Sequence, residues 1–120
     1  MARYVDGFVI PISKKKLATY KKMAALSCKV WLEHGALDYV ESVGEDLKVK
    51  WGATFPRTHK LKAGETIVFS WITYKSRAHR DRVNAAVMKD PRLKDMCSPD
   101  TMPFEMKRML YGGFEVLVSA

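Results

Sequence analysis

The stretch ETIVFSWITYKSRAHRDRVN, residues 65–84, contains a change of hydrophobic period that predicts a strand followed by a helix. Its first ten residues are rich in aromatic and β-branched side chains, which is typical of a strand. Ser76 is a good N-cap, and apolar residues recur at helical spacing from there to about Lys89. Asp90-Pro91 ends this helix, because proline disfavours helical geometry in the residue before it.

The rest of the chain repeats this order. Ser13 caps a helix that runs from Lys14 to about His34, where Gly35 stops it. Three further strands are expected at residues 4–12, 37–43 and 109–118, while 44–64 is a long connection and 92–108 is ambiguous between short helical turns and loop. The order predicts an α+β fold of the ferredoxin-like βαββαβ type, an antiparallel sheet with both helices on one face. The right-handed crossover rule is taken to place the first and third strands side by side and parallel.

Composition limits the class of protein. The 120 residues fit one domain, 1–120, with an ordinary globular balance of 48% hydrophobic and 28% charged residues. No apolar run approaches the ~20 residues that a membrane helix needs, and the N-terminus lacks the apolar region of a signal peptide. Two cysteines without metal spacing favour a reduced cytoplasm. The net charge of +8 admits an anionic partner, nucleic acid included, although a soluble basic protein with scattered surface lysines is the preferred explanation of the charge alone.

Strand alternation distributes the side chains over two faces, both of them apolar. We expect the helices to cover Val5 and Val9, Val40, Val68 and Ile72, and the alternate residues of the last strand from Phe114 to Val118. The other face is then rich in aromatics, which marks an interaction surface. A second copy of the sheet would cover it and enclose a pocket. The expected pocket-lining residues are Tyr4, Tyr39, Phe69, Trp71 and Tyr111.

Three carboxylates and one histidine are candidate catalytic groups. Asp6, Glu41 and Glu115 are expected near strand centres on the aromatic face, where burial would perturb their pKa values. Structural ion pairing explains them equally well. His79 shares a helical stripe with Val83, which favours a packed residue over a catalytic one because no nucleophile lies at a readable spacing. The histidines show no metal-binding pattern, so no metal or other cofactor is expected.

Both predicted helices have basic first turns. If their strands are parallel neighbours, both helices begin at the same end of the sheet, and six cations gather there. Helix N-termini bind anions readily, so this grouping is a hypothesis for phosphate, nucleic acid or an acidic substrate. The alternative is that the side chains extend separately into water. The six residues are Lys14, Lys15, Lys16, Lys75, Arg77 and Arg80.

Several long strings resemble a known bacterial family, the domain of unknown function 1428. They include WLEHGALDYVE, residues 31–41, GETIVFSWITYKSRAHRDRVN, residues 64–84, and MPFEMKRMLYGGFEVLV, residues 102–118. The resemblance covers nearly the whole chain and implies a small cytoplasmic protein of the dimeric α/β-barrel superfamily. It implies no catalytic residues, since no activity is established for the family. The wider superfamily includes cofactor-free monooxygenases, isomerases and haem-binding proteins, but this is an analogy of fold alone.

Three hypotheses follow. The first is a homodimer that binds a small aromatic or anionic molecule between the sheet and its partner, with acid/base chemistry by Asp6, Glu41 or Glu115 as an option. The second is a nucleic-acid or anion-binding module that uses the basic helix starts. The third is a dimer whose inner face is only structural. Sequence alone leaves enzyme against binding protein open, and it does not identify the ligand.

Overall fold

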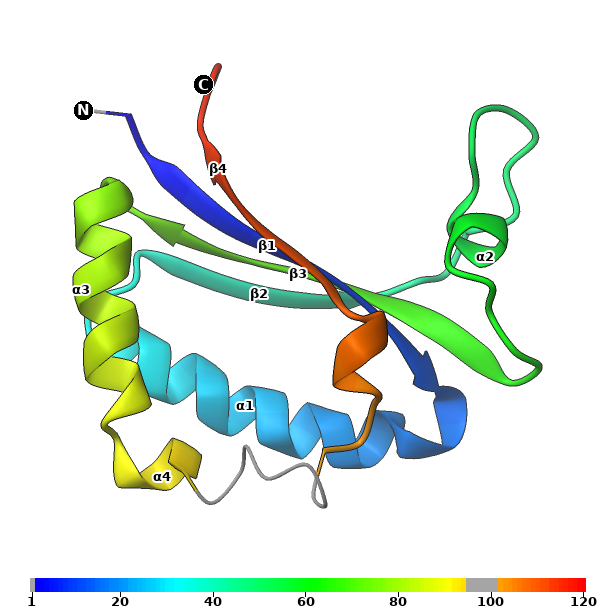
Figure 1. Cartoon of the computed structure of the whole chain (residues 1–120), viewed down its shortest axis with the longest axis horizontal. Helices are drawn as coiled ribbons and strands as arrows, with labels where there is room; N and C mark the ends of the chain where they lie inside the picture. Colours follow the sequence, from blue (N-terminus) through cyan, green and yellow to red (C-terminus); the bar gives the residue numbers. More distant parts are fainter. Residues whose placement is uncertain (1, 95–101) are drawn as a thin grey trace.

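The computed structural model describes residues 2–94 and 102–120, and these form four strands with the two long helices packed on one side (Figure 1). Residues 95–101, part of the segment that sequence left ambiguous, lie outside the described residues. The predicted strand and helix order is confirmed, and the predicted bounds of the four strands and two long helices are close to those observed. The elements are β1 (Tyr4–Ser13), η1 (Lys14–Lys16), α1 (Leu17–Glu33), β2 (Asp38–Val43), α2 (Phe55–Thr58), β3 (Glu65–Tyr74), α3 (Arg77–Met88), α4 (Pro91–Lys94), η2 (Met106–Arg108) and β4 (Leu110–Glu115).

The sheet has the strand order β2-β3-β1-β4, and every neighbouring pair is antiparallel. This is the ferredoxin-like fold that the element order predicts. The expectation that β1 and β3 run parallel is wrong, because Tyr4 pairs with Tyr74 and Ser13 with Glu65. After β2 the chain passes through α2 into β3, which inserts between β1 and β2. The crossover through α1 therefore joins two parallel strands that are not neighbours.

The antiparallel pairing separates the two basic helix starts. η1 follows the end of β1, whereas α3 follows the end of β3, and these ends lie at opposite edges of the molecule (Figure 1). Lys14, Lys15 and Lys16 are therefore remote from Lys75, Arg77 and Arg80. The expected grouping of six cations is wrong, and the reason is strand direction rather than local helix capping.

Both helix starts are capped as expected. The Ser76 hydroxyl accepts a hydrogen bond of 3.1 Å from the backbone N–H of His79, and the Ser13 hydroxyl accepts one of 3.3 Å from the backbone N–H of Lys15. Each serine satisfies a donor that the helix itself leaves free. Gly35 ends the α1 region with φ of 112°, a conformation that favours glycine.

The core has two apolar clusters between the sheet and the helices. One joins Tyr74 and Ile72 of β3 to Val30 of α1 and to Val83 and Val87 of α3. The second joins Ile10, Ile12 and Val68 of the sheet to Tyr20 and Ala24 of α1. Together they fix α1 along the sheet and α3 across one end of it (Figure 1).

The register assigns each strand's faces. In β3 the prediction is confirmed, since Val68 and Ile72 face the helices. In the other three strands it is inverted. Tyr4, Asp6 and Phe8 share the helix face with their β3 partners, and so do Tyr39 and Glu41. Val5, Val9, Val40 and Phe114 lie on the opposite face. Alternation gives the period but not the direction when both faces of a sheet are apolar.

Candidate functional site

Glu41 is held between two tyrosine hydroxyls on the helix side of β2. Its Oε1 accepts a hydrogen bond of 2.7 Å from Tyr20 of α1, and its Oε2 accepts one of 2.7 Å from Tyr39, two residues away on the same strand. Tyr39 and Glu41 point the same way because strand side chains alternate. Tyr20 reaches them because α1 packs along this face. The result is a fixed carboxylate between helix and sheet.

The two hydroxyls remain protonated donors. Burial raises the pKa of both Tyr20 and Tyr39, and the neighbouring Glu41 carboxylate raises them further. Each carboxylate oxygen uses one of its acceptor positions on a tyrosine. Glu41 is only half-buried, so its oxygens retain acceptor capacity toward a bound molecule.

An inner cavity of about 190 Å³ lies beside Glu41. Phe8 and Ile72 form part of its sheet wall, and Tyr20 and Trp31 form part of its helix wall. The segment 102–109 closes another side. Four methionines contribute to the lining, and their flexible thioether side chains suit ligands of varied shape. They are Met23, Met102, Met106 and Met109.

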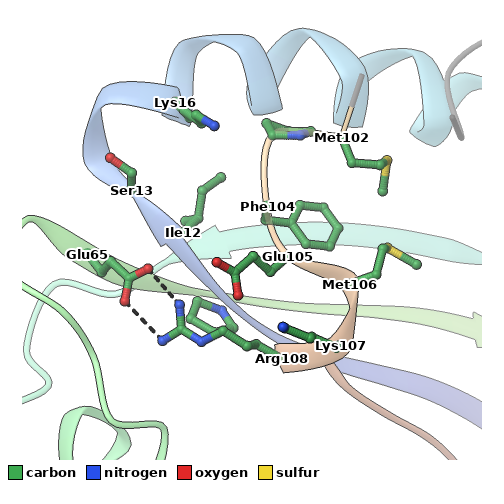
Figure 2. Close-up of a pocket in the computed structure, with 12 residues that line it drawn as sticks. Ile12, Ser13, Lys16, Glu65, Met102, Phe104, Glu105, Met106, Lys107 and Arg108 are labelled. Atoms are coloured by element: carbon green, nitrogen blue, oxygen red, sulfur yellow. Dashed lines mark hydrogen bonds and ion pairs between the residues drawn. The ribbon is translucent and has the colours of Figure 1, made fainter. Parts of the chain in front are cut away.

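Two larger hollows adjoin the inner cavity. A groove of about 460 Å³ between α1 and the β2 edge shares Tyr20, Ala24, Tyr39 and Glu41 with it. An outer pocket of about 570 Å³ lies on the other side of the inner cavity from this groove, between the end of β1 and the segment 102–108 (Figure 2). Glu41 thus lines both the inner cavity and the groove, and its side chain is only half-buried.

The outer pocket is framed by a strong ion pair. Arg108 donates from Nη1 to Glu65 Oε2 at 2.7 Å and from Nη2 to Glu65 Oε1 at 3.0 Å (Figure 2). Hydrogen bonding from Arg108 lowers the pKa of the Glu65 carboxyl to about 2, with a smaller opposing effect of burial. This two-point contact fastens η2 to the start of β3. It positions the segment that separates the outer pocket from the inner cavity.

Asp6 lies in a separate, closed polar cluster under α3. The residue is 1% exposed, and its Oδ1 lies 3.6 Å from Nε of Arg80, beyond hydrogen-bond distance. Neither atom has a hydrogen-bond partner within the part of the chain that the structure describes. Burial raises the pKa of Asp6, and the Arg80 charge opposes this rise only partly. Asp6 lines neither of the two pockets nor the groove, so it cannot touch a molecule bound there.

The other members of this cluster include two of the residues expected to line a pocket. Arg80 donates from Nη2 to the Tyr4 hydroxyl at 3.2 Å and from Nη1 to the Tyr111 hydroxyl at 3.5 Å. Trp31 donates from Nε1 to Tyr74 Oη and to Asn84 Oδ1, each at 3.1 Å. The cluster therefore fixes one wall of the inner cavity, Trp31, without opening into it.

The remaining candidates lie apart from Glu41. Glu115 is exposed at the end of β4, paired with Tyr4. His79 accepts a hydrogen bond of 3.0 Å at Nδ1 from the backbone N–H of Lys75, and burial lowers its pKa, so its ring is a neutral packed group. Phe69 and Trp71 lie on the opposite face of the sheet. Of the expected pocket residues only Tyr39 lines the cavity beside Glu41.

Several residues of the site were not predicted. Tyr20, Trp31, Phe104 and the methionines line the cavity, yet none of them is among the candidate site residues named from the sequence. The available signal was a polar-tipped tyrosine on the apolar stripe of α1, because a buried hydroxyl needs a hydrogen-bond partner. That signal does not say which carboxylate is the partner.

The face of the sheet opposite the helices is apolar and open. Phe69 is 45% exposed, Leu110 57% and Phe114 61%. The Phe114 ring lies against Gly7 and Gly112, where a methyl group would meet it at 3.4 Å. The glycines make a flat surface for this ring. Val5, Val9, Val40 and Trp71 complete the same face.

Comparison with known proteins identifies the family. The model for "Protein of unknown function (DUF1428)" matches residues 3–106. The chain belongs to this family. The uncharacterized protein YbaA of Escherichia coli K12 is 40% identical over 116 residues, covering 97% of each chain. The YbaA protein of Shigella flexneri matches equally.

A solved structure supports the fold. The crystal structure of a dimeric ferredoxin-like protein from an uncultured marine organism superposes with a TM-score of 0.63 and covers 100% of both chains at 12% identity. At this identity the similarity shows the fold alone. Over residues 2–94 and 102–120, no helix is long and apolar enough to cross a membrane. The same residues contain no group of three or more histidine, cysteine, aspartate or glutamate side chains placed to hold a metal ion.

Proposed function

We propose that this protein binds a small molecule with an aromatic or apolar body and a hydrogen-bond donor, which is directed at Glu41. The main support for this proposal is the position of the Glu41 carboxylate. It accepts hydrogen bonds of 2.7 Å from Tyr20 and Tyr39, and it lines both the inner cavity and the groove. A carboxylate with spare acceptor positions in an apolar cavity selects a donor.

The size and charge of the inner cavity restrict the class of ligand that it can bind. An apolar cavity of about 150 Å³ holds benzene, so the inner cavity of about 190 Å³ has room for one ring. An anionic group beside Glu41 would be repelled, which favours the aromatic over the anionic ligand near this carboxylate. If the bound molecule reacts by losing a proton, Glu41 is the base within reach.

The proposal includes a homodimer. The open face carries Phe69, Leu110 and Phe114, each about half exposed or more, and a second sheet would remove this apolar surface from water. The solved neighbour of this fold is described as dimeric. The residues around Glu41 lie on the helix face of the sheet rather than on the open face. In the proposed dimer the ligand pocket therefore lies between the sheet and the helices of each protomer, and the partner's sheet covers the open face.

The arrangement of the strands does not support the alternative of a nucleic-acid or anion-binding module. It depended on two basic helix starts lying side by side, and antiparallel pairing places them at opposite ends of the sheet. We therefore do not propose it.

Calorimetric titration with p-cresol, toluene and benzoate tests the binding proposal. We expect p-cresol to bind best and Glu41→Gln to weaken it about tenfold, since a hydrogen bond to a charged group contributes about 1.5–3 kcal/mol. Glu45→Gln, in the exposed loop after β2, is the matched control. Equal affinity of p-cresol for the wild type and the Glu41→Gln variant would refute the role of Glu41.

Sedimentation of the unliganded protein tests the dimer. Phe114→Glu places a charge on the open face at its most exposed phenylalanine, and we expect a monomer at micromolar concentration. Leu32→Glu introduces the same charge at an exposed position on α1 and should leave the dimer intact. A wild-type monomer would exclude this arrangement.

A further inference from the structure

We infer that the ligand is an α-amino acid with a hydroxyphenyl side chain, whose charged head lies in the outer pocket. This inference rests on the proposed function and specifies its ligand class. Two observations support it. The outer pocket and the inner cavity share lining residues, and the outer pocket is lined by charged side chains of both signs.

The two hollows meet at three side chains. Met102, Phe104 and Met106 line the outer pocket, as Figure 2 shows, and they also line the inner cavity. Phe104 also touches Tyr20, edge to face, with ring centroids 5.8 Å apart. A ligand ring near Tyr20 and Glu41 therefore lies just behind the wall of the outer pocket. Methionines are adaptable enough to let a linking chain pass between the two hollows.

The outer pocket contains charges of both signs. Glu65 and Arg108 neutralise each other through their two-point contact, so they contribute little to a ligand. The remaining charged residues of the lining are Lys16, Lys107 and Glu105. Glu105 has an ion pair with Lys62 at 3.7 Å, but both side chains are at least half exposed, and such pairs contribute little. Glu105 can therefore exchange that partner for a ligand.

This combination fits a zwitterion better than a simple anion or cation. A carboxylate suits Lys16, which lies just before the start of α1, and Lys107 on η2 adds a second ammonium group. An anion alone would also meet the Glu105 carboxylate. An α-ammonium group beside the ligand carboxylate removes this repulsion, because it provides Glu105 with a cation.

Four compounds with the same ring separate the contributions. The four compounds are compared by calorimetric titration. p-Cresol has no charged head group, 3-(4-hydroxyphenyl)propionate has an anionic one, tyramine has a cationic one and L-tyrosine has the zwitterion. We expect L-tyrosine to bind at least about tenfold more tightly than each of the other three, from charge-assisted contacts at both ends of its head.

Variants assign the charges. Glu105→Gln should reduce the affinity for L-tyrosine to that for the propionate, while leaving the propionate as tight or tighter. The double variant Lys16→Gln and Lys107→Gln should reduce the affinity for L-tyrosine to the affinity for tyramine. Lys22→Gln and Lys29→Gln, made together on the exposed side of α1, form the matched control. All the substituted positions are exposed, so folding should be retained.

The outcomes distinguish this inference from the proposed function. If p-cresol binds in a Glu41-dependent way and L-tyrosine binds no more tightly than p-cresol or the propionate, the amino-acid inference is wrong and the proposed function stands. The same conclusion follows if Glu105→Gln leaves the preference for L-tyrosine unchanged. If none of the four compounds binds, both are wrong.

Discussion

Replacing Asp6 with asparagine should stabilise the protein at neutral pH. Asp6 is 1% exposed, and its Oδ1 has no hydrogen-bond partner among the described residues. Burying a charged group costs free energy, and the neutral asparagine side chain removes this cost even where its amide oxygen gains no partner. The attraction of Arg80 opposes this cost, but the pKa of Asp6 is still raised, so burial has the larger effect. We expect Asp6→Asn to increase the free energy of unfolding by about 1 kcal/mol at pH 7.

The effect should depend on pH in a defined direction. A raised pKa means that the folded protein keeps the Asp6 proton to higher pH than the unfolded chain does. The stability from this group is therefore complete below the unfolded pKa of 3.8 and is lost as the pH rises through the folded value. The advantage of Asp6→Asn should be absent near pH 3 and should grow above pH 4.

Urea unfolding at fixed protein concentration, followed by circular dichroism between pH 3 and pH 8, measures this difference. Asp46→Asn in the exposed loop is the matched control and should show no such trend. Arg80 retains the Tyr4 and Tyr111 hydroxyls, so losing the carboxylate does not leave it without contacts. A loss of about 3–5 kcal/mol in Asp6→Asn would refute the reasoning, because it would mean that Asp6 and Arg80 form a net stabilising buried pair.

Two further substitutions test contacts that hold the fold together. Glu65→Gln should lower the free energy of unfolding by about 2 kcal/mol at pH 7, because Arg108 loses a charged acceptor at both nitrogens. The pKa of Glu65 is lowered to about 2, so the wild-type advantage should persist above pH 4.5 and disappear as the pH falls through 2; a gap between the denaturation curves that does not change with pH would contradict this. Gly113→Ala should lower the melting temperature, with a cost of about 1–3 kcal/mol, because its methyl group would overlap the Tyr4 hydroxyl. Gly112→Ala meets only the Phe114 ring and should cost less, so equal losses in the two variants would indicate a general intolerance of β4.

Much of the secondary structure could be predicted from local sequence. The change of period after Tyr74, the caps at Ser13 and Ser76 and the stop at Gly35 depend on neighbouring residues only. The short α2 helix within 44–64 was missed, because four residues give too little periodicity to distinguish a helical turn from a loop.

The candidate site was predictable only in part. Glu41 and Tyr39 were named because they alternate on one strand, which is a local property. Tyr20 lies 21 residues from Glu41, and Phe104 is further still, so no local pattern links them. The segment 102–109 closes the cavity through the contact of Arg108 with Glu65, 43 residues away.

The sequence by itself determined the order of strands and helices, the caps between them and the presence of two apolar sheet faces. Tertiary structure decided which face the helices cover, and hence that Glu41 lies under α1 and Phe114 on the open side. It also decided that the basic helix starts lie at opposite ends of the sheet. The physical reason is that periodicity depends on residues a few positions apart. Strand direction and the choice of buried face depend instead on how distant segments pair, and a sheet apolar on both sides gives them no local signal.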